Sequence, residues 1–331
     1  MSFDGFILRK QYEKMRGLGD RLAVMKDQIE WGPFIPLVRR VFRDDGVRGG
    51  RPHTDELVVV RSMLLQAWYG LSDPELEFQC HDRLSFRHFL GFPETIPDFT
   101  TIWKIRDRLV TAGVDHLIWD EVQRQLDQKG YRVKTGVIQD ASFIEADVGK
   151  KRYHREKKAR RQGKSIEYTK KQRRHMDQDG GFSVKQGQVH YGYKSHIKVD
   201  IDHHLIRDLR VTAANVHDSA VHLVTVGDRV VYRDKGYFGK RVAVPGVVDK
   251  TMKRAVRGHR LNGGEQRRNK AIGRVRAPGE RPFSVIKRVF HGERTGVKTC
   301  ARVRVKEMFK CFAYDVYQLV TLERKRLAVA M

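Results

Sequence analysis

The sequence predicts an α+β protein of mixed architecture, with a helical N-terminal domain over residues 1–130 and a mixed β-sheet with flanking helices over residues 131–331. Apolar residues recur at three- and four-residue steps in the first part, whereas alternating and β-branched runs begin near residue 135. The charge divides at the same place. Residues 1–130 hold 19 Lys and Arg against 20 Asp and Glu, so the whole net charge of +26 lies in the second part.

Four helices account for the clearest periodicity of the N-terminal domain. Thr54 is the expected N-cap of the first helix, and Asp73-Pro74 is the expected start of the second. A third helix should begin near Asp98, and a fourth should cover residues 114–129. The inner faces of the first and third helices carry Leu57, Val60, Leu64, Trp68, Ile102, Ile105 and Leu109.

These short helices joined by tight turns are compatible with a helix-turn-helix DNA reader. The third helix would then be the reading helix, with the polar residues Thr100, Thr101, Lys104 and Arg108 toward DNA. Because the region is nearly neutral, a plain helical bundle with a solvated face is an equal alternative. The sequence therefore predicts either DNA-end recognition or assembly for this domain.

The second part changes to a strand pattern. The predicted strands span residues 135–139, 189–199, 205–211, 229–233 and 242–248, and helices are expected at residues 283–290 and 301–326. The second and third strands are separated by turn residues and should form an antiparallel hairpin. Strands and helices in this order predict a mixed sheet with helices against it.

The composition limits the class of protein. A net charge of +26 favours a polyanionic partner, with nucleic acid the first candidate and an anionic membrane surface the second. Three scattered cysteines exclude a secreted disulfide scaffold. The most apolar stretch, residues 57–71, contains Arg61 and is too short to span a membrane, and the N-terminus shows no signal pattern. We expect a soluble, cytoplasmic protein with no membrane or small-molecule partner.

A strongly basic run connects the first predicted strand to the hairpin. Residues 150–174 contain 13 Lys and Arg against Glu156 and Glu167, with Tyr153 and Tyr168 interleaved. Such runs are usually solvated and flexible. Because this run follows a candidate catalytic carboxylate, we favour a segment that tracks DNA phosphates through Arg160, Arg161, Arg173 and Arg174.

Two aspartates, Asp140 and Asp234, are predicted to lie at strand ends in the basic half of the chain. Carboxylates held by a sheet and open to solvent suit Mg²⁺ bound between protein and phosphate oxygens. Two such ions can activate an attacking oxygen and stabilise the leaving one in phosphodiester chemistry. Asp218 is a rival for the second ligand, but no strand leads directly into it, so a structural role is preferred. A zinc site at His217 and His222 is disfavoured.

Three glutamates are candidates for a third acid: Glu265, Glu280 and Glu293. Glu280 has the most organised surroundings, because Arg276 precedes it by four residues and Lys287 follows it by seven. Pro278, Gly279 and Pro282 oppose a continuous helix, and Pro282 fits the first turn of a helix that begins near Glu280.

These motifs, taken in order, resemble the bacterial insertion-sequence transposases of the DDE class, which have a ribonuclease-H-like catalytic core. The resemblance covers most of the chain and rests on Asp140, residues 191–196, residues 212–218, residues 234–237 and the series Arg276, Glu280 and Lys287. The family signature has a Tyr three residues before its Arg, where this chain has Gly273. The chain therefore departs from the signature at the position of the Tyr that contacts a DNA end.

The resemblance implies that Asp140, Asp234 and Glu280 hold two Mg²⁺ or Mn²⁺ ions, and that Arg276 and Lys287 grip the DNA backbone. It implies hydrolysis at the ends of the element and attack of the freed 3′-hydroxyl on target DNA. The expected partners are double-stranded DNA, as terminal inverted repeats and target, and further copies of the chain on that DNA. A metal-dependent nuclease without strand transfer and a non-catalytic nucleic-acid binder remain alternatives.

Overall fold

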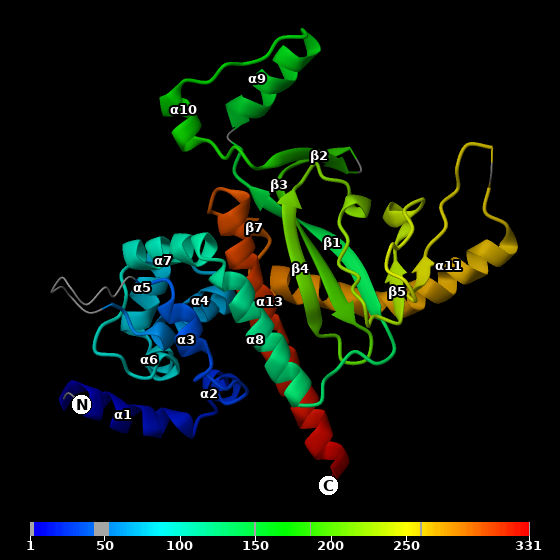
Figure 1. The fold of residues 1–331 in the computed structure, drawn as a ribbon. Helices are drawn as coiled ribbons and strands as arrows, with labels where there is room; N and C mark the ends of the chain where they lie inside the picture. The colour runs from blue at the N-terminus through cyan, green and yellow to red at the C-terminus, as the bar shows by residue number, and fades with distance from the viewer. Residues whose placement is uncertain (1–2, 43–52, 149, 186, 259, 331) are drawn as a thin grey trace.

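The computed structural model describes residues 3–42, 53–148, 150–185, 187–258 and 260–330, and Figure 1 shows its fold. All regular secondary structure described before residue 137 is helical. They are α1 (Phe3–Arg16), α2 (Arg21–Lys26), α3 (Phe34–Arg39), α4 (Glu56–Tyr69), α5 (Asp73–Asp82), α6 (Leu84–Leu90), α7 (Phe99–Thr111) and α8 (Val114–Gln128).

The four expected helices are present as α4, α5, α7 and α8. Asp98 caps α7 by accepting the Thr101 N–H at 2.6 Å, as its position predicts. The predicted cap of α4 is wrong by one residue. Asp55, and not Thr54, accepts the Val58 N–H at 2.9 Å and takes the N-cap position.

The second part is built on one mixed sheet. Its strands are β1 (Val137–Ala146), β2 (Gly181–Lys185), β3 (Gln188–Asp200), β4 (Ile206–Ala213), β5 (Val230–Arg233), β6 (Val248–Thr251) and β7 (Arg294–Thr295). The main order is β2-β3-β1-β5-β6, and β4 also pairs with β3 while β7 pairs with β1. The pairs β1–β3 and β3–β4 are antiparallel, whereas β5 and β6 run parallel to β1. This arrangement confirms the predicted α+β class with a ribonuclease-H-like core.

Two strand predictions need correction. β1 does not end at Asp140 but continues to Ala146, because the long strand β3 pairs with it from Val137 to Glu145. The strand predicted over residues 242–248 is also wrong, since β6 begins only at Val248. Pro245 and Gly246 form a turn inside the predicted range, and neither residue favours a strand interior.

The remaining helices surround the sheet or project from it. They are α9 (Lys150–Arg161), α10 (Lys170–His175), α11 (Gly263–Arg276), α12 (Arg281–Arg288), α13 (Cys300–Ala330) and the short 3-10 helices η1 (Asp218–Ala220), η2 (Lys235–Tyr237) and η3 (Ala277–Glu280). Figure 1 shows α9 and α10 projecting at the top and α11 extending to the right. The two helices predicted near the C-terminus are present as α12 and α13.

Helix α13 joins the N-terminal helices to the sheet and lies between them in Figure 1. Trp68 of α4 donates its indole N–H to the Ala313 carbonyl at 2.8 Å, and the buried Asp315 accepts the Ile206 N–H of β4 at 2.8 Å. One hydrophobic cluster includes residues from α4, α7, α8, α13, β3 and β4. The N-terminal helices and the sheet therefore share a core, although their net charges differ.

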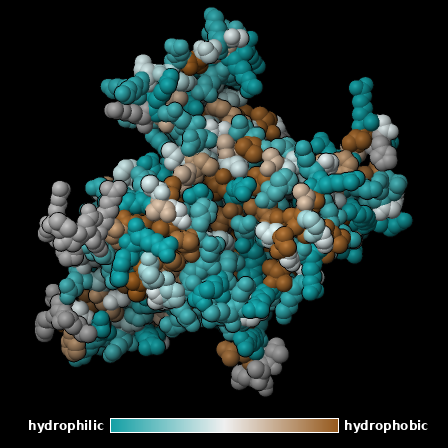
Figure 2. Space-filling view, viewed as in Figure 1, coloured by the Kyte–Doolittle hydropathy of each residue, from teal (hydrophilic) through white to brown (hydrophobic). Residues whose placement is uncertain are grey.

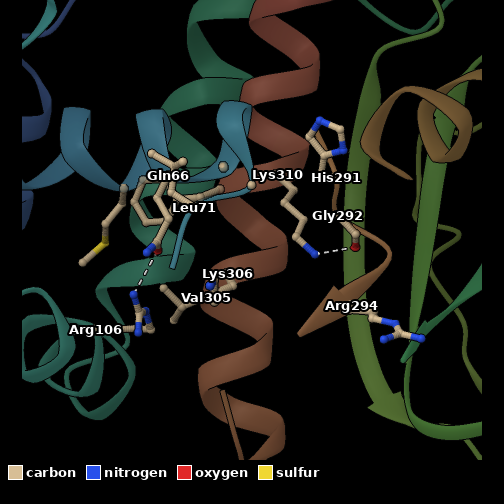
Figure 3. A pocket seen from close by; sticks show the side chains of 13 residues that line it. Gln66, Leu71, Arg106, His291, Gly292, Arg294, Val305, Lys306 and Lys310 are labelled. Carbon is tan, nitrogen blue, oxygen red and sulfur yellow. Dashed lines mark hydrogen bonds between the residues drawn. The ribbon is translucent and has the colours of Figure 1, made fainter. Parts of the chain in front are cut away.

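A small cavity of about 40 Å³ lies at this junction, and its lining is drawn in Figure 3. The buried Arg106 donates to Gln66 at 3.0 Å and pairs with Asp73 at 2.6 Å. Burial lowers the pKa of the neighbouring Lys306 to about 8. None of the predicted catalytic acids lines this cavity, so it belongs to the packing of α13.

No helix within the described ranges is both long and apolar enough to cross a membrane.

Candidate active site

The register of two neighbouring strands brings Asp140 and Asp234 to the same level. β1 and β5 are parallel, and Ile138 is paired with Tyr232. Asp140 and Asp234 each follow that pair by two residues, and side chains two residues apart on an extended strand share a face. Both carboxylates therefore lie on the face of the sheet that carries Ile138. Asp234 also accepts the Gly236 N–H at 2.7 Å, which fixes it at the start of η2.

Close packing brings Glu280 to the same face. A Cβ atom added to Gly279 would lie 2.8 Å from Ile138 Cγ2 and 3.0 Å from its Cδ1, so only glycine lets η3 approach β1 this closely. Glu280 follows directly, is exposed, and stands at the N-cap of α12. Pro282 occupies the first turn of that helix, as the sequence predicts.

Asp140 and Asp234 are half-buried, whereas Glu280 is exposed, and Asp140 is paired with Arg276. Arg276 Nη2 lies 2.6 Å from Asp140 Oδ2, and the two side chains are only 11% and 17% exposed. Burial raises the pKa of the Asp140 carboxyl to about 6. Arg276 and the Ala141 N–H act against this increase, whereas the carboxylates of Asp234 and Glu280 add to it. The three acids thus interact electrostatically.

Asp218 lies on the other face of the sheet. It accepts a hydrogen bond from Lys194 Nζ at 2.8 Å, and Lys194 is paired with Phe143 of β1. Positions 140 and 143 differ by an odd number, so their side chains point to opposite faces. Tyr237 is buried, and burial first, then the charges of Asp140, Asp218 and Asp234, raise its pKa. This placement agrees with a structural role for Asp218.

The other candidate glutamates lie away from these acids. Glu265 belongs to the capping box of α11 and pairs with Lys253 at 2.8 Å. Glu293 and Lys287 line a separate cavity of about 230 Å³, together with Glu145. Glu145 is half-buried, and its carboxylate lies 2.5 Å from His190 Nδ1. Lys287 follows Glu280 by two helical turns and lies further along the same helix.

The predicted reading residues do not form one group. Thr101, Lys104 and Arg108 line a groove of about 1000 Å³ beside α7. Thr100 instead lines a cavity of about 370 Å³ with the exposed aromatic residues Phe99 and Trp103. Lys104 and Arg108 are exposed, so both can meet a partner.

The basic run folds into the two helices α9 and α10, whose base is fixed to the sheet. Arg152 donates to the Asp177 carbonyl and to the Tyr191 hydroxyl, each at 2.8 Å, and pairs with Glu156 at 2.7 Å. The exposed predicted contacts are Arg160, Arg161 and Arg173. The side chain of Arg174 lies outside the described part of the structure.

Two family models match the chain. One, described as a transposase DDE domain, matches residues 131–316, which is more than half of the sequence. The chain therefore belongs to the DDE transposase family. The other, described as a transposase domain (DUF772), matches residues 10–108, so both parts of the chain have transposase counterparts. No solved structure matches the chain.

Membership of the DDE transposase family implies DNA as a partner and the use of divalent metal ions. The donor chemistry here fits such ions, because the carboxylates of Asp234 and Glu280 act on Asp140, and carboxylates offer the oxygen ligands that Mg²⁺ prefers. Within the described residues, however, no three His, Cys, Asp or Glu side chains already converge as a ligand cluster. Arg276 supplies the positive charge beside Asp140 instead.

The family departure at Gly273 has a structural counterpart. A Cβ atom at Gly273 would lie 3.2 Å from the terminal methyl of Met252. The Met252 side chain therefore occupies the space beside this position of α11. Sequence reasoning missed this contact and the close approach of Gly279 to β1. The Pro278-Gly279 pair directly before Glu280 is the signal that could have indicated the close approach to β1.

Because Asp140 must lose its proton to bind a cation, Mn²⁺ affinity should fall as the pH drops through about 6. Arg276 lowers the pKa of Asp140, so Arg276→Met should move the midpoint of this fall to higher pH. Arg274→Met is the matched control, since Arg274 is exposed and two residues away on the same helix. Mn²⁺ titrations from pH 5 to pH 8 would test this. An unchanged midpoint in Arg276→Met would contradict the coupling.

Proposed function

We propose that the chain is a transposase that binds the ends of its own insertion sequence, cleaves the phosphodiester by metal-dependent hydrolysis and joins the freed 3′-hydroxyl to target DNA. The observation that supports this best is the placement of Asp140, Asp234 and Glu280 on one face of the sheet. It comes from a strand register and a glycine contact, and so does not depend on the family match.

In this proposal Asp140, Asp234 and Glu280 are the catalytic residues and hold two Mg²⁺ or Mn²⁺ ions. When bound, the ions supply activation of the attacking oxygen and stabilisation of the leaving oxygen. Arg276 and Lys287 hold backbone phosphates next to the scissile bond. Arg276 is paired with Asp140 in the structure, so DNA phosphate and Asp140 compete for its guanidinium group.

We assign the choice of DNA ends, or assembly on them, to the domain formed by residues 1–130. Thr100, Thr101, Lys104 and Arg108 of α7 are the proposed contacts with DNA. A near-neutral domain gains little from phosphates and must rely on base contacts or on self-association. Residues 131–331 then form the catalytic domain, and the active form on DNA is a homo-oligomer.

We assign the helices α9 and α10 to contacts with the DNA backbone through Arg160, Arg161, Arg173 and Arg174. The interactions of Arg152 hold the base of these helices on the sheet, which supports a preformed surface. Such contacts position DNA without reading its sequence. A salt series of binding constants measures their contribution.

The experiment that tests the proposed function uses labelled DNA with the ends of the element, target plasmid and Mg²⁺. Cleaved strands and strands joined to plasmid are separated on a gel. Joined strands are expected for a transposase. A nuclease without strand transfer would give cleaved strands alone, and a non-catalytic DNA-binding protein would give neither.

A further inference from the structure

Helix α11 has one face that is fixed to the catalytic core. Asn269 and Ile272 are buried on this face. The Asn269 side chain accepts the Lys253 N–H at 2.9 Å and donates to the Lys253 carbonyl at 2.8 Å, which ties the helix to the segment after β6. Arg276, the last residue of α11, lies one turn after Ile272 and reaches Asp140. The orientation of the helix relative to the active site is therefore set.

The opposite face of α11 carries three cations that have no partner among the described residues. Arg267, Lys270 and Arg274 follow one another at spacings of three and four residues, so they share a face. All three are exposed. Within the described parts of the chain, none of them makes a hydrogen bond or an ion pair. The acid of the same helix, Glu265, is already engaged by the Asn262 N–H and by Lys253.

The geometry of this face suits a DNA backbone. A rise of 1.5 Å per residue spreads the three cations over about 10 Å, so they repel one another and can meet two or three neighbouring phosphates. Two of the cations are arginines, whose planar groups bind phosphate oxygens through paired hydrogen bonds. Figure 2 shows that the projection formed by α11 is covered mainly by hydrophilic residues.

We propose that the face formed by Arg267, Lys270 and Arg274 is a second DNA-backbone surface, separate from the helices α9 and α10. It binds duplex DNA that continues from the scissile bond, without reading sequence. The location follows from the helix itself, because α11 ends at the catalytic acids and extends away from the sheet (Figure 1). This inference rests on the proposed function for the position of the scissile bond.

The test is a triple variant, Arg267→Gln with Lys270→Gln and Arg274→Gln, which removes three charges and keeps good helix formers. The matched control replaces Lys10, Lys14 and Arg16 of α1, which also are exposed and lie at the far side of the molecule from α11. Dissociation constants for element ends and random duplexes are measured between 50 and 400 mM salt, and circular dichroism checks that both variants fold.

The slope of the logarithm of the binding constant against the logarithm of the salt concentration should become smaller by about two to three in the α11 variant, equally for both DNAs. The α1 control should leave this slope unchanged. A slope change no larger than that of the control would overturn the inference. So would a loss confined to element ends, because that would indicate sequence reading. A parallel variant of Arg160, Arg161 and Arg173 should add to the α11 effect, since the two surfaces are separate.

The outcome is separable from that of the proposed function. If the wild type joins DNA but the α11 slope is unchanged, only this inference fails. If the salt slope of the α11 variant decreases as expected but the wild type neither cuts nor joins DNA, α11 is confirmed as a DNA-binding face and the proposed function fails. Weaker binding to anionic vesicles with unchanged DNA binding would assign the face to a membrane and would contradict the inference.

Discussion

Replacing Asp234 by Asn is expected to abolish DNA cleavage and to leave DNA binding nearly intact. The side chain keeps its size but loses the negative charge that attracts a divalent cation. Metal ions contribute several kcal/mol of transition-state stabilisation, and each 1.36 kcal/mol is tenfold in rate, so a fall of about 10³-fold or more is expected. Asp140→Asn and Glu280→Gln should have effects of the same size.

Cleavage rates and gel shifts measured on the same samples would test this prediction. Asp218→Asn is the matched control, because Asp218 pairs with Lys194 on the other face of the sheet. Loss of a residue that supports a metal ligand typically costs about 10–100-fold, so its effect should be smaller. A larger loss in Asp218→Asn than in Asp234→Asn would show that the second ligand is wrongly assigned.

Gly279→Ala should reduce cleavage about 100-fold although it changes no ionisable group. The added methyl would meet Ile138 at 2.8 Å, so η3 must move away from β1 and carry Glu280 with it. A displacement of about 1 Å in a catalytic group can cost about 10²-fold. Overpacking of this kind also lowers the free energy of unfolding by about 1–3 kcal/mol.

A second substitution separates the two effects of Gly279→Ala. Ile138→Ala removes the Cγ2 and Cδ1 atoms that the new methyl would meet at 2.8 and 3.0 Å, so the double variant should recover much of the lost cleavage relative to Gly279→Ala alone. Gly296→Ala is the control, because a Cβ atom there meets nothing within 4 Å. Cleavage rates that simply multiply in the double variant would contradict the packing explanation.

Local sequence patterns predicted the elements that carry their own signals. The β3–β4 hairpin, the start of α7 at Asp98 and the strand before Asp234 all follow from alternation, caps and turn residues. Predicted strand ends indicate Asp140 and Asp234, and flanking cations indicate Glu280. The register of β1 and β5 then brings the two aspartates to one level. That register depends on partners distant in sequence, so no local pattern contains it.

The errors arose where distant residues decide the structure. β1 continues past Asp140 because β3 and β7 supply backbone partners, and its second half alternates too weakly to predict this. The pairing of Arg276 with Asp140 joins residues 136 positions apart. The role of α13 was missed for the same reason, since it depends on contacts such as that of Trp68 with Ala313, which are far apart in the sequence.

The most direct measurement of the central claim is a joining assay with pre-cut, labelled element ends and target plasmid. Ends with a 3′-hydroxyl should become joined to plasmid in the presence of Mg²⁺ or Mn²⁺, whereas ends with a 3′-hydrogen should not. Asp140→Asn, Asp234→Asn and Glu280→Gln should each remove the joined product. Joining that persists in any of these variants, or a wild type that cuts DNA but never joins a 3′-hydroxyl end, would contradict the account.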